Sequence, residues 1–378
     1  MSLSKTASLN KLILIIVLYI ASINVRAGNQ EGETAYQSGD YSEALKEFRP
    51  LANDGNAVAQ YDMGVMYLYG RGVPTDYQIA MTLFQKAANQ GLDKAQYSLG
   101  MMYYLGLGGT INFKLAANWL QKASSQGYAD AETNLGVMYD SGQGVLQNYK
   151  SAMILFRKAA EAGVAQAQFN IGRLYYCGLG VSQNYQSAEV WFKKAAEQNN
   201  VTAQFNLGIM YDSGKGVPQD YNQAAFWFQK ASENGFAQAQ YSLANFYYNG
   251  YGVEKDYNAA VSLYQKSAEQ GYAPAQFMLG LMYKIGRVVA KDYNETIIWY
   301  RKAAEQNHSG AQCALGIMFK NGLGVTADLI QADMWFKIAA VHGDTFAIRS
   351  RNAIEPNMSS HELKQSQLLA QDWLAKHK

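Results

Sequence analysis

The apolar and polar positions of this chain repeat every 36 residues. The pattern A-Q-[YF]-x-L-G-x-M-Y-x-x-G-x-G-V starts at eight alanines, the first at Ala59 and the last at Ala311. Within one unit, residues 203–211 carry apolar side chains at a spacing that predicts a short amphipathic helix rather than a strand. Self-similarity at such a period is typical of a solenoid, in which each unit packs mainly on its neighbours.

The residues after this first helix predict a turn and a second helix in every unit. The first helix is expected to end at a glycine in left-handed conformation, followed by an Asp or Asn that caps the next helix. In the fifth unit, the stripe Tyr221, Ala224, Ala225 and Phe228 has helical spacing and must pack against another element. A Gly or Asn then ends the second helix, so each unit is predicted to be a helical hairpin.

A glycine also lies inside the first helix of seven units, with Ala244 in its place in the sixth. Such a glycine costs about 1 kcal/mol relative to alanine in an isolated helix, so seven of them require a packing reason. We expect the missing side chain to let another helix approach closely, with large aromatic residues filling the remaining space.

These residues carry a family resemblance. The segments Ala203-Gln-Phe-Asn-Leu-Gly-Ile-Met-Tyr211 and Gly214-Lys-Gly-Val217 resemble those of Sel1-like repeat proteins, relatives of the tetratricopeptide solenoids. The resemblance extends from residue 59 to about residue 347. It implies an all-α fold, a right-handed α/α solenoid of eight 36-residue helical hairpins with terminal caps.

The same register divides the chain into four parts. Residues 1–27 are expected to be a signal peptide, because Lys5 and Lys11 precede a short apolar run and Val25-Arg26-Ala27 offers small residues for cleavage. The alternative, an uncleaved anchor, is disfavoured because the apolar run is well short of the ~20 residues that span a bilayer. We expect an N-terminal capping half-repeat at 28–58, the eight repeats at 59–346, and capping helices at 347–378.

Composition narrows the classes of partner. The formal net charge is +2, and removal of residues 1–27 would leave 29 basic against 30 acidic residues. Nucleic acid is therefore not expected as a partner, since phosphate binding requires clustered positive charge. Only Cys177 and Cys313 are present, and they fall in different units, so we expect two unpaired thiols. No integral membrane span is expected after signal cleavage.

No constellation of residues predicts catalysis, a cofactor or a metal site. The four histidines lie at spacings unlike those of metal-ligand pairs. Some cysteine-rich members of the resembled family are associated with β-lactam binding or hydrolysis. The S-x-x-K arrangement of such enzymes occurs here only at Ser2/Lys5 and Ser8/Lys11, inside the expected signal. We expect no enzymatic activity.

The first helices vary at their fourth, seventh and eleventh positions, which share one face by helical spacing. The resemblance implies that this face lines the concave surface, where mixed amide, hydroxyl and apolar side chains suit a peptide. The alternative is that these positions vary only because their side chains are exposed to solvent and have no function. The seventh unit departs most from the pattern and has the most apolar face, so it is the preferred docking patch. The candidate partner-binding residues are Met278, Leu281, Lys284, Ile285, Arg287, Asn206, Ile209, Asn245, Asn249 and Tyr248.

The sequence thus predicts an exported, non-enzymatic scaffold that binds protein or peptide segments, located in the periplasm or secreted. The resemblance implies a role in the bacterial envelope. The rival hypothesis is a cell-wall protein that binds or hydrolyses peptidoglycan or β-lactams. The residues alone do not name the partner.

Overall fold

The computed structural model describes residues 30–377, which form helices and no strand. The expected signal peptide, residues 1–27, lies outside this range. The helices fall into two compact units, one ending at Gln198 and one beginning at Asn199. The first unit contains α2 (Gln30–Ser38), α3 (Tyr41–Asn53), α4 (Ala57–Tyr69), α5 (Tyr77–Asn89), α6 (Asp93–Leu105), α7 (Phe113–Ser125), α8 (Ala129–Ser141), α9 (Tyr149–Glu161), α10 (Ala165–Cys177) and α11 (Tyr185–Glu197).

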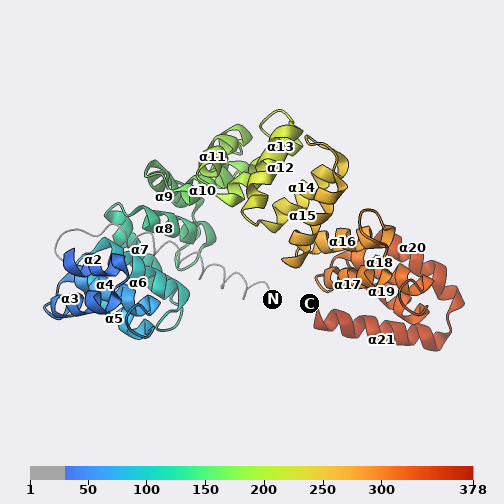
Figure 1. Cartoon of the computed structure of the whole chain (residues 1–378), viewed down its shortest axis with the longest axis horizontal. Coiled ribbons are helices and arrows are strands. Elements are labelled where there is room, and N and C mark those ends of the chain that lie inside the picture. Colours follow the sequence, from blue (N-terminus) through green and yellow to red (C-terminus); the bar gives the residue numbers. More distant parts are fainter. Residues whose placement is uncertain (1–29, 378) are drawn as a thin grey trace. The chain divides into compact units, whose positions relative to one another are not determined.

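The second unit continues the same alternation of helices. It contains α12 (Val201–Ser213), α13 (Tyr221–Glu233), α14 (Ala237–Asn249), α15 (Tyr257–Glu269), α16 (Ala273–Ile285), α17 (Tyr293–Ala304), α18 (Ser309–Asn321), α19 (Leu329–Val341), α20 (Thr345–Ile354), the 3-10 turn η1 (Glu355–Asn357) and α21 (Ser360–Lys376). Helices α4 to α19 pair in order into eight hairpins, whose two helices lie side by side (Figure 1). The predicted all-helical repeat fold is confirmed.

Each predicted helix boundary has its expected geometry. All eight first helices end at a glycine with φ between 64° and 78°. The Asp or Asn before each second helix accepts a hydrogen bond from a backbone N–H of the first turn, as Asp220 does from Asn222 at 2.9 Å. The second helices are followed by a left-handed residue, which is Asn at 199 and 307 and Gly elsewhere. These local signals set the hairpin length.

In seven of the eight hairpins, a glycine inside the first helix lies against a large side chain of the second helix. A Cβ built on Gly208 would lie 2.5 Å from Cδ1 of Phe228, and one on Gly64 would lie 2.7 Å from Cε1 of Phe84. The same contact recurs with Leu120, Phe156, Phe192, Tyr300 and Phe336. We call this contact the seam of the hairpin. It explains the glycines that helix propensity alone disfavours.

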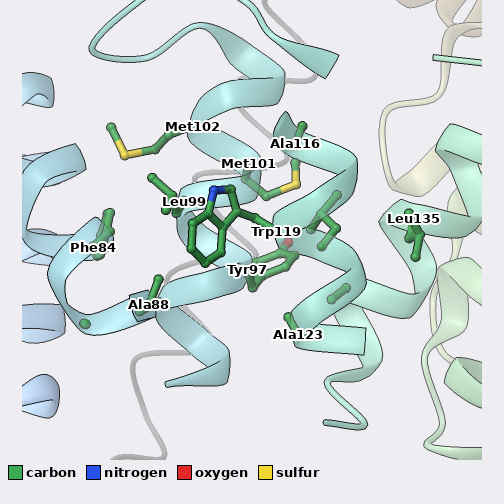
Figure 2. Packing of buried hydrophobic residues seen from close by; sticks show 14 of the residues in the cluster. Phe84, Ala88, Tyr97, Leu99, Met101, Met102, Ala116, Trp119, Ala123 and Leu135 are labelled. Atoms are coloured by element: carbon green, nitrogen blue, oxygen red, sulfur yellow. The ribbon is translucent and has the colours of Figure 1, made fainter. Parts of the chain in front are cut away.

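Apolar side chains of neighbouring hairpins continue the core between the seams. One cluster joins the first three hairpins, and Figure 2 shows part of it, with Tyr97 and Leu99 of α6 and Trp119 of α7. Tyr97 and Leu99 are almost fully buried, and Trp119 is 9% exposed. The tryptophan therefore fills space between helices, as the sequence predicted.

A buried glutamine at the start of most first helices joins three helices. In the second hairpin, Nε2 of Gln96 donates to the carbonyl of Ala88 at 3.2 Å, and its Oε1 accepts from Nε2 of Gln126 at 2.9 Å. The third hairpin has Glu132 at this position, with 5% exposure, and Ala162 in place of the second glutamine. A carboxylate has no N–H to donate, so this position differs chemically from the others.

The N-terminal end of the repeat array is closed by a pair of helices. Residues 28–58 were expected to form a half-repeat, but α2 and α3 form a complete hairpin, in which a Cβ on Gly32 would lie 2.6 Å from Cε1 of Phe48. The turn between α2 and α3 is shorter than the turn within each repeat, which sets this hairpin apart from the 36-residue pattern. The next helix starts at Ala57, two residues before the predicted boundary.

The C-terminal cap is fastened by buried charge. Asp333 of α19 is fully buried and contacts both Nζ of Lys337 and the hydroxyl of Ser366, which comes from α21. Nζ of Lys337 also lies 3.3 Å from Oε1 of Glu355. Hydrogen bonds of Ser366 to this buried ion pair thus hold α21 against α19. Breaking a buried pair of this kind typically costs about 3 to 5 kcal/mol.

Candidate docking surface

The fourth, seventh and eleventh positions of the first helices form the predicted binding surface, which we call the first-helix face. Its eleventh positions are exposed from the third hairpin onward, from Ser141 to Asn321. The fourth and seventh positions are more enclosed than the helical spacing suggested, and Ser98 and Met101 are buried. The reason is that the fourth position contacts the preceding hairpin, as Nδ2 of Asn134 donates to the hydroxyl of Tyr97 at 3.3 Å.

In the seventh hairpin the apolar residues of the predicted docking patch, Met278, Leu281 and Ile285, differ in exposure. We call these three residues the apolar strip. Met278 and Leu281 are half-buried and pack against a buried cluster that includes Val261 and Ala268 of the preceding hairpin. Ile285 is 53% exposed. Two of the three side chains of this strip therefore fill the junction between hairpins. Ile285 is the part of the strip that a partner could contact.

Positive charge gathers beside Ile285. The guanidinium of Arg287 lies over the ring of Tyr257, 4.8 Å from its centroid, and Lys284 is one residue from Ile285. The ring of Tyr257 also packs edge-on against Tyr248 at 5.2 Å. The structure therefore places three candidate residues, Tyr248, Ile285 and Arg287, on adjacent elements at one junction.

The turn that carries Arg287 is strained. Val288 has a φ of 75°, at a position where the other hairpins have glycine. A β-branched residue rarely adopts this conformation, and such strain costs about 1 to 3 kcal/mol. The Val288 side chain is 45% exposed, so the strain brings an apolar side chain to the surface near Ile285.

The amide side chains of the fifth and sixth hairpins are partly engaged within the chain. Nδ2 of Asn206 donates to the carbonyl of Thr202 at 2.8 Å, and Nδ2 of Asn249 donates to the carbonyl of Asn245 at 2.8 Å. Oδ1 of Asn245 accepts from the hydroxyl of Tyr264 at 2.6 Å. Ile209 is half-buried in this row. These contacts orient the amides but leave acceptor oxygens of Asn206 and Asn249 for a ligand.

The tenth position of the first helix, one residue before the exposed eleventh, is an aspartate in two hairpins. In the third hairpin, Oδ1 of Asp140 accepts a hydrogen bond from Nη2 of Arg173 of the next hairpin at 2.6 Å. The fifth hairpin has Asp212 at this position, and burial raises the pKa of its carboxyl. The 36-residue period shows that both aspartates occupy the same position of the first helix. The contact between Asp140 and Arg173, which lie 33 residues apart, is visible only in the structure.

Other kinds of site find no support in the described part of the chain. Residues 30–377 contain no cluster of three His, Cys, Asp or Glu side chains that could hold a metal ion. Cys177 is exposed, Cys313 is buried, and neither forms a disulfide. None of the helices in this range has both the length and the apolar character that a membrane crossing requires.

Comparisons with known proteins agree with this geometry. A family model described as Sel1 repeat matches eight consecutive segments: 57–92, 93–128, 129–164, 165–200, 201–236, 237–272, 273–308 and 309–344. These bounds begin with each first helix. No curated protein matches the chain.

Two solved structures are similar over most of the chain. A Sel1 repeat protein from Oxalobacter formigenes shares 30% identity with a TM-score of 0.62, over 82% of this chain and 90% of that chain. A protective antigen of uropathogenic Escherichia coli strains, displaying an SLR fold, shares 29% identity with a TM-score of 0.56, over 88% of this chain and 95% of that chain.

Proposed function

The chain belongs to the Sel1 repeat family, and from this membership we propose that it is an exported, non-enzymatic scaffold that binds a peptide segment of a partner protein on its first-helix face. Proteins of this family generally serve as protein-interaction scaffolds. The observation that carries the proposal is the contrast within each hairpin. The seam keeps the same glycine contact in seven of the eight hairpins, whereas the exposed eleventh positions change from Ser to Cys, Asn and Ile.

The seventh hairpin offers the strongest anchor on this face. Ile285 and Val288 are exposed apolar side chains, and Lys284 and Arg287 supply positive charge next to them. A segment with an apolar residue and an acidic flank complements this combination. Apolar contact would provide most of the affinity, and charge would guide the approach.

A matched pair of isoleucines tests the location of the site. Ile285 of α16 and Ile298 of α17 belong to the same hairpin and are 53% and 45% exposed. The probe is a fluorescent peptide library with leucine anchors and a glutamate flank. We expect Ile285→Asp to weaken binding at least tenfold and Ile298→Asp to leave it within twofold. Equal losses in both variants would contradict a site on the first-helix face.

Charged and apolar residues should affect different rate constants of peptide binding. We expect Lys284→Glu to slow association and to reduce its dependence on salt, with a smaller effect on dissociation. Leu281→Asp is a poorer probe of binding, because Leu281 is half-buried between hairpins and its replacement would lower the melting temperature as well. Stopped-flow binding beside thermal melts distinguishes these effects.

Export and lack of enzymatic activity are separate parts of the proposal. Support for export is the charged and apolar pattern of residues 1–27, which predicts mature protein starting near Gly28. An intact mass that retains Met1 in the purified native protein would overturn it. Hydrolysis of nitrocefin by the mature protein would favour the cell-wall enzyme instead, and we expect none.

A further inference from the structure

Two aspartates occupy the same helical position two hairpins apart, and their surroundings differ. Asp140 of α8 is paired with Arg173 of α10, and the side chains of both are less than one-third exposed. The guanidinium lies on the carboxylate at 2.6 Å, 33 residues further along the chain. The ion pair therefore shows that a guanidinium fits against an aspartate at this position.

Asp212 of α12 lacks this internal cation. The residue that corresponds to Arg173 is Asn245, whose Oδ1 accepts a hydrogen bond from Tyr264 at 2.6 Å. Among the described residues, no cation lies within ion-pair distance of the Asp212 carboxylate. The carboxyl is half-buried, and burial raises its pKa, because removing water disfavours the charged form.

The neighbours of Asp212 make this position suitable for a ligand side chain. Ile209 lies one turn earlier on the same helix, and Ser213 beside it is exposed. Tyr248 stands at the same position in the next hairpin, one residue before the exposed Asn249. A half-buried carboxylate gains more from a cation than an exposed one does, because solvent screens the pair less.

We propose that Asp212 binds an arginine side chain of the partner segment, in the way that Asp140 binds Arg173. The inference rests on the proposed function, since it assigns the chemistry of one residue in the bound segment. Arginine is favoured over lysine because its planar guanidinium can bind a carboxylate through two hydrogen bonds and can stack on an aromatic ring. The structure thus gives the segment a basic residue in addition to the acidic flank expected at the seventh hairpin.

The test compares two peptide libraries that differ at one residue. Both contain random heptapeptides, with a central arginine in one and the neutral isostere citrulline in the other. We expect the full mature chain to bind the arginine library at least tenfold more tightly. Asp212→Asn should remove this preference, and Asn245→Arg should remove it by supplying an internal guanidinium. Asp140→Asn should leave the preference unchanged, because Asp140 is already paired.

A further variant is designed to create a second arginine-binding site. Arg173→Asn frees Asp140 and converts the third hairpin into a copy of the fifth. We expect one additional arginine-selective site, seen as doubled stoichiometry by isothermal titration. Thermal melts of each variant establish that it is folded.

The outcomes separate the two proposals. Equal binding of both libraries, unaffected by Asp212→Asn, would overturn the arginine assignment and leave peptide binding intact. Binding of neither library by the folded protein would overturn peptide binding, and the arginine assignment with it. An arginine preference that persists in Asp212→Asn would place the cation at another residue and contradict the assignment.

Discussion

The seam and the first-helix face lie on the same helices but follow opposite rules. Along the seam, a glycine contacts a large side chain in seven of the eight hairpins, and in the sixth Ala244 takes its place beside Tyr264. On the first-helix face, the exposed position is Ser141 in one hairpin and Ile285 in another. The comparison teaches that packing permits almost no variation at the seam, whereas the face is free to differ.

This contrast identifies where function can reside. A repeated hairpin cannot bury its apolar surface alone, so every seam and junction is committed to stability. Arg173 lies on the first-helix face and forms an ion pair with Asp140 at the neighbouring tenth position, so a residue of the face can also contribute to stability. Asp212 and Ile285 also depart from the repeat, but they form no ion pair of this kind with any described residue. Such positions are the ones to test for binding.

The largest expected effect comes from filling a seam. Gly208→Leu places a side chain where even a Cβ would lie 2.5 Å from Phe228, so we expect a loss of about 3 kcal/mol in the free energy of unfolding. Urea unfolding measures it. Lys230→Ala is the control, because Lys230 is exposed on the second helix and should cost less than about 0.5 kcal/mol. Similar losses in the two variants would mean that the seam is not what stabilises the hairpin.

A smaller change in stability, of opposite sign, is expected at the turn that contains Val288. Val288→Gly should relieve the left-handed strain at φ 75° and raise the free energy of unfolding by about 1 to 2 kcal/mol. Because Val288 is also an exposed apolar side chain beside Ile285, the stabilised variant should bind the acidic peptide library more weakly. Destabilisation by this glycine would show that the valine is not strained.

The smallest expected effect depends on pH. Burial raises the pKa of Glu132, an effect that nearby Lys158 opposes and Glu161 reinforces. A raised pKa in the folded state means that the protonated form is favoured there, so stability is lost as pH rises through that pKa. Glu132→Gln should therefore stabilise the chain by about 0.5 to 1 kcal/mol at pH 7 and by less near pH 4.

Melting temperatures of the wild type and this variant across that pH range give the comparison. The double variant Glu132→Gln with Ala162→Gln should add a further gain, because it completes the glutamine contacts seen between Gln96 and Gln126. A pH-independent difference would contradict the assignment of a buried, ionised Glu132.

Local signals explain how much of the fold the sequence predicted. The glycine and Asn or Asp positions that bound each helix depend only on backbone conformation and capping, so periodicity was sufficient to locate them. The seam contact of Phe228 was not predicted, because a contact across 20 residues leaves no local signature, although seven of the eight hairpins have an aromatic residue at this position. For the cap at residues 28–58, the sequence predicted a half-repeat rather than the hairpin of α2 and α3, because the turn of this hairpin departs from the 36-residue period.

The candidate site was predicted less completely. Helical spacing identified the first-helix face, but it could not show that Met278 and Leu281 pack on the preceding hairpin while Ile285 stays open. Burial at a junction depends on the approach of two hairpins, which a one-dimensional pattern does not contain. For the same reason, the different surroundings of Asp140 and Asp212 became visible only in the structure.

Site-specific photocrosslinking in the producing cell tests the central claim most directly. A benzophenone amino acid would replace Ile285 in one version of the chain and Ile298 in another, two positions of one hairpin with similar exposure. If the first-helix face holds the partner, position 285 yields a discrete crosslinked species that position 298 does not, and excess acidic peptide suppresses it. Crosslinks that form equally at both positions, or only at 298, would contradict the account.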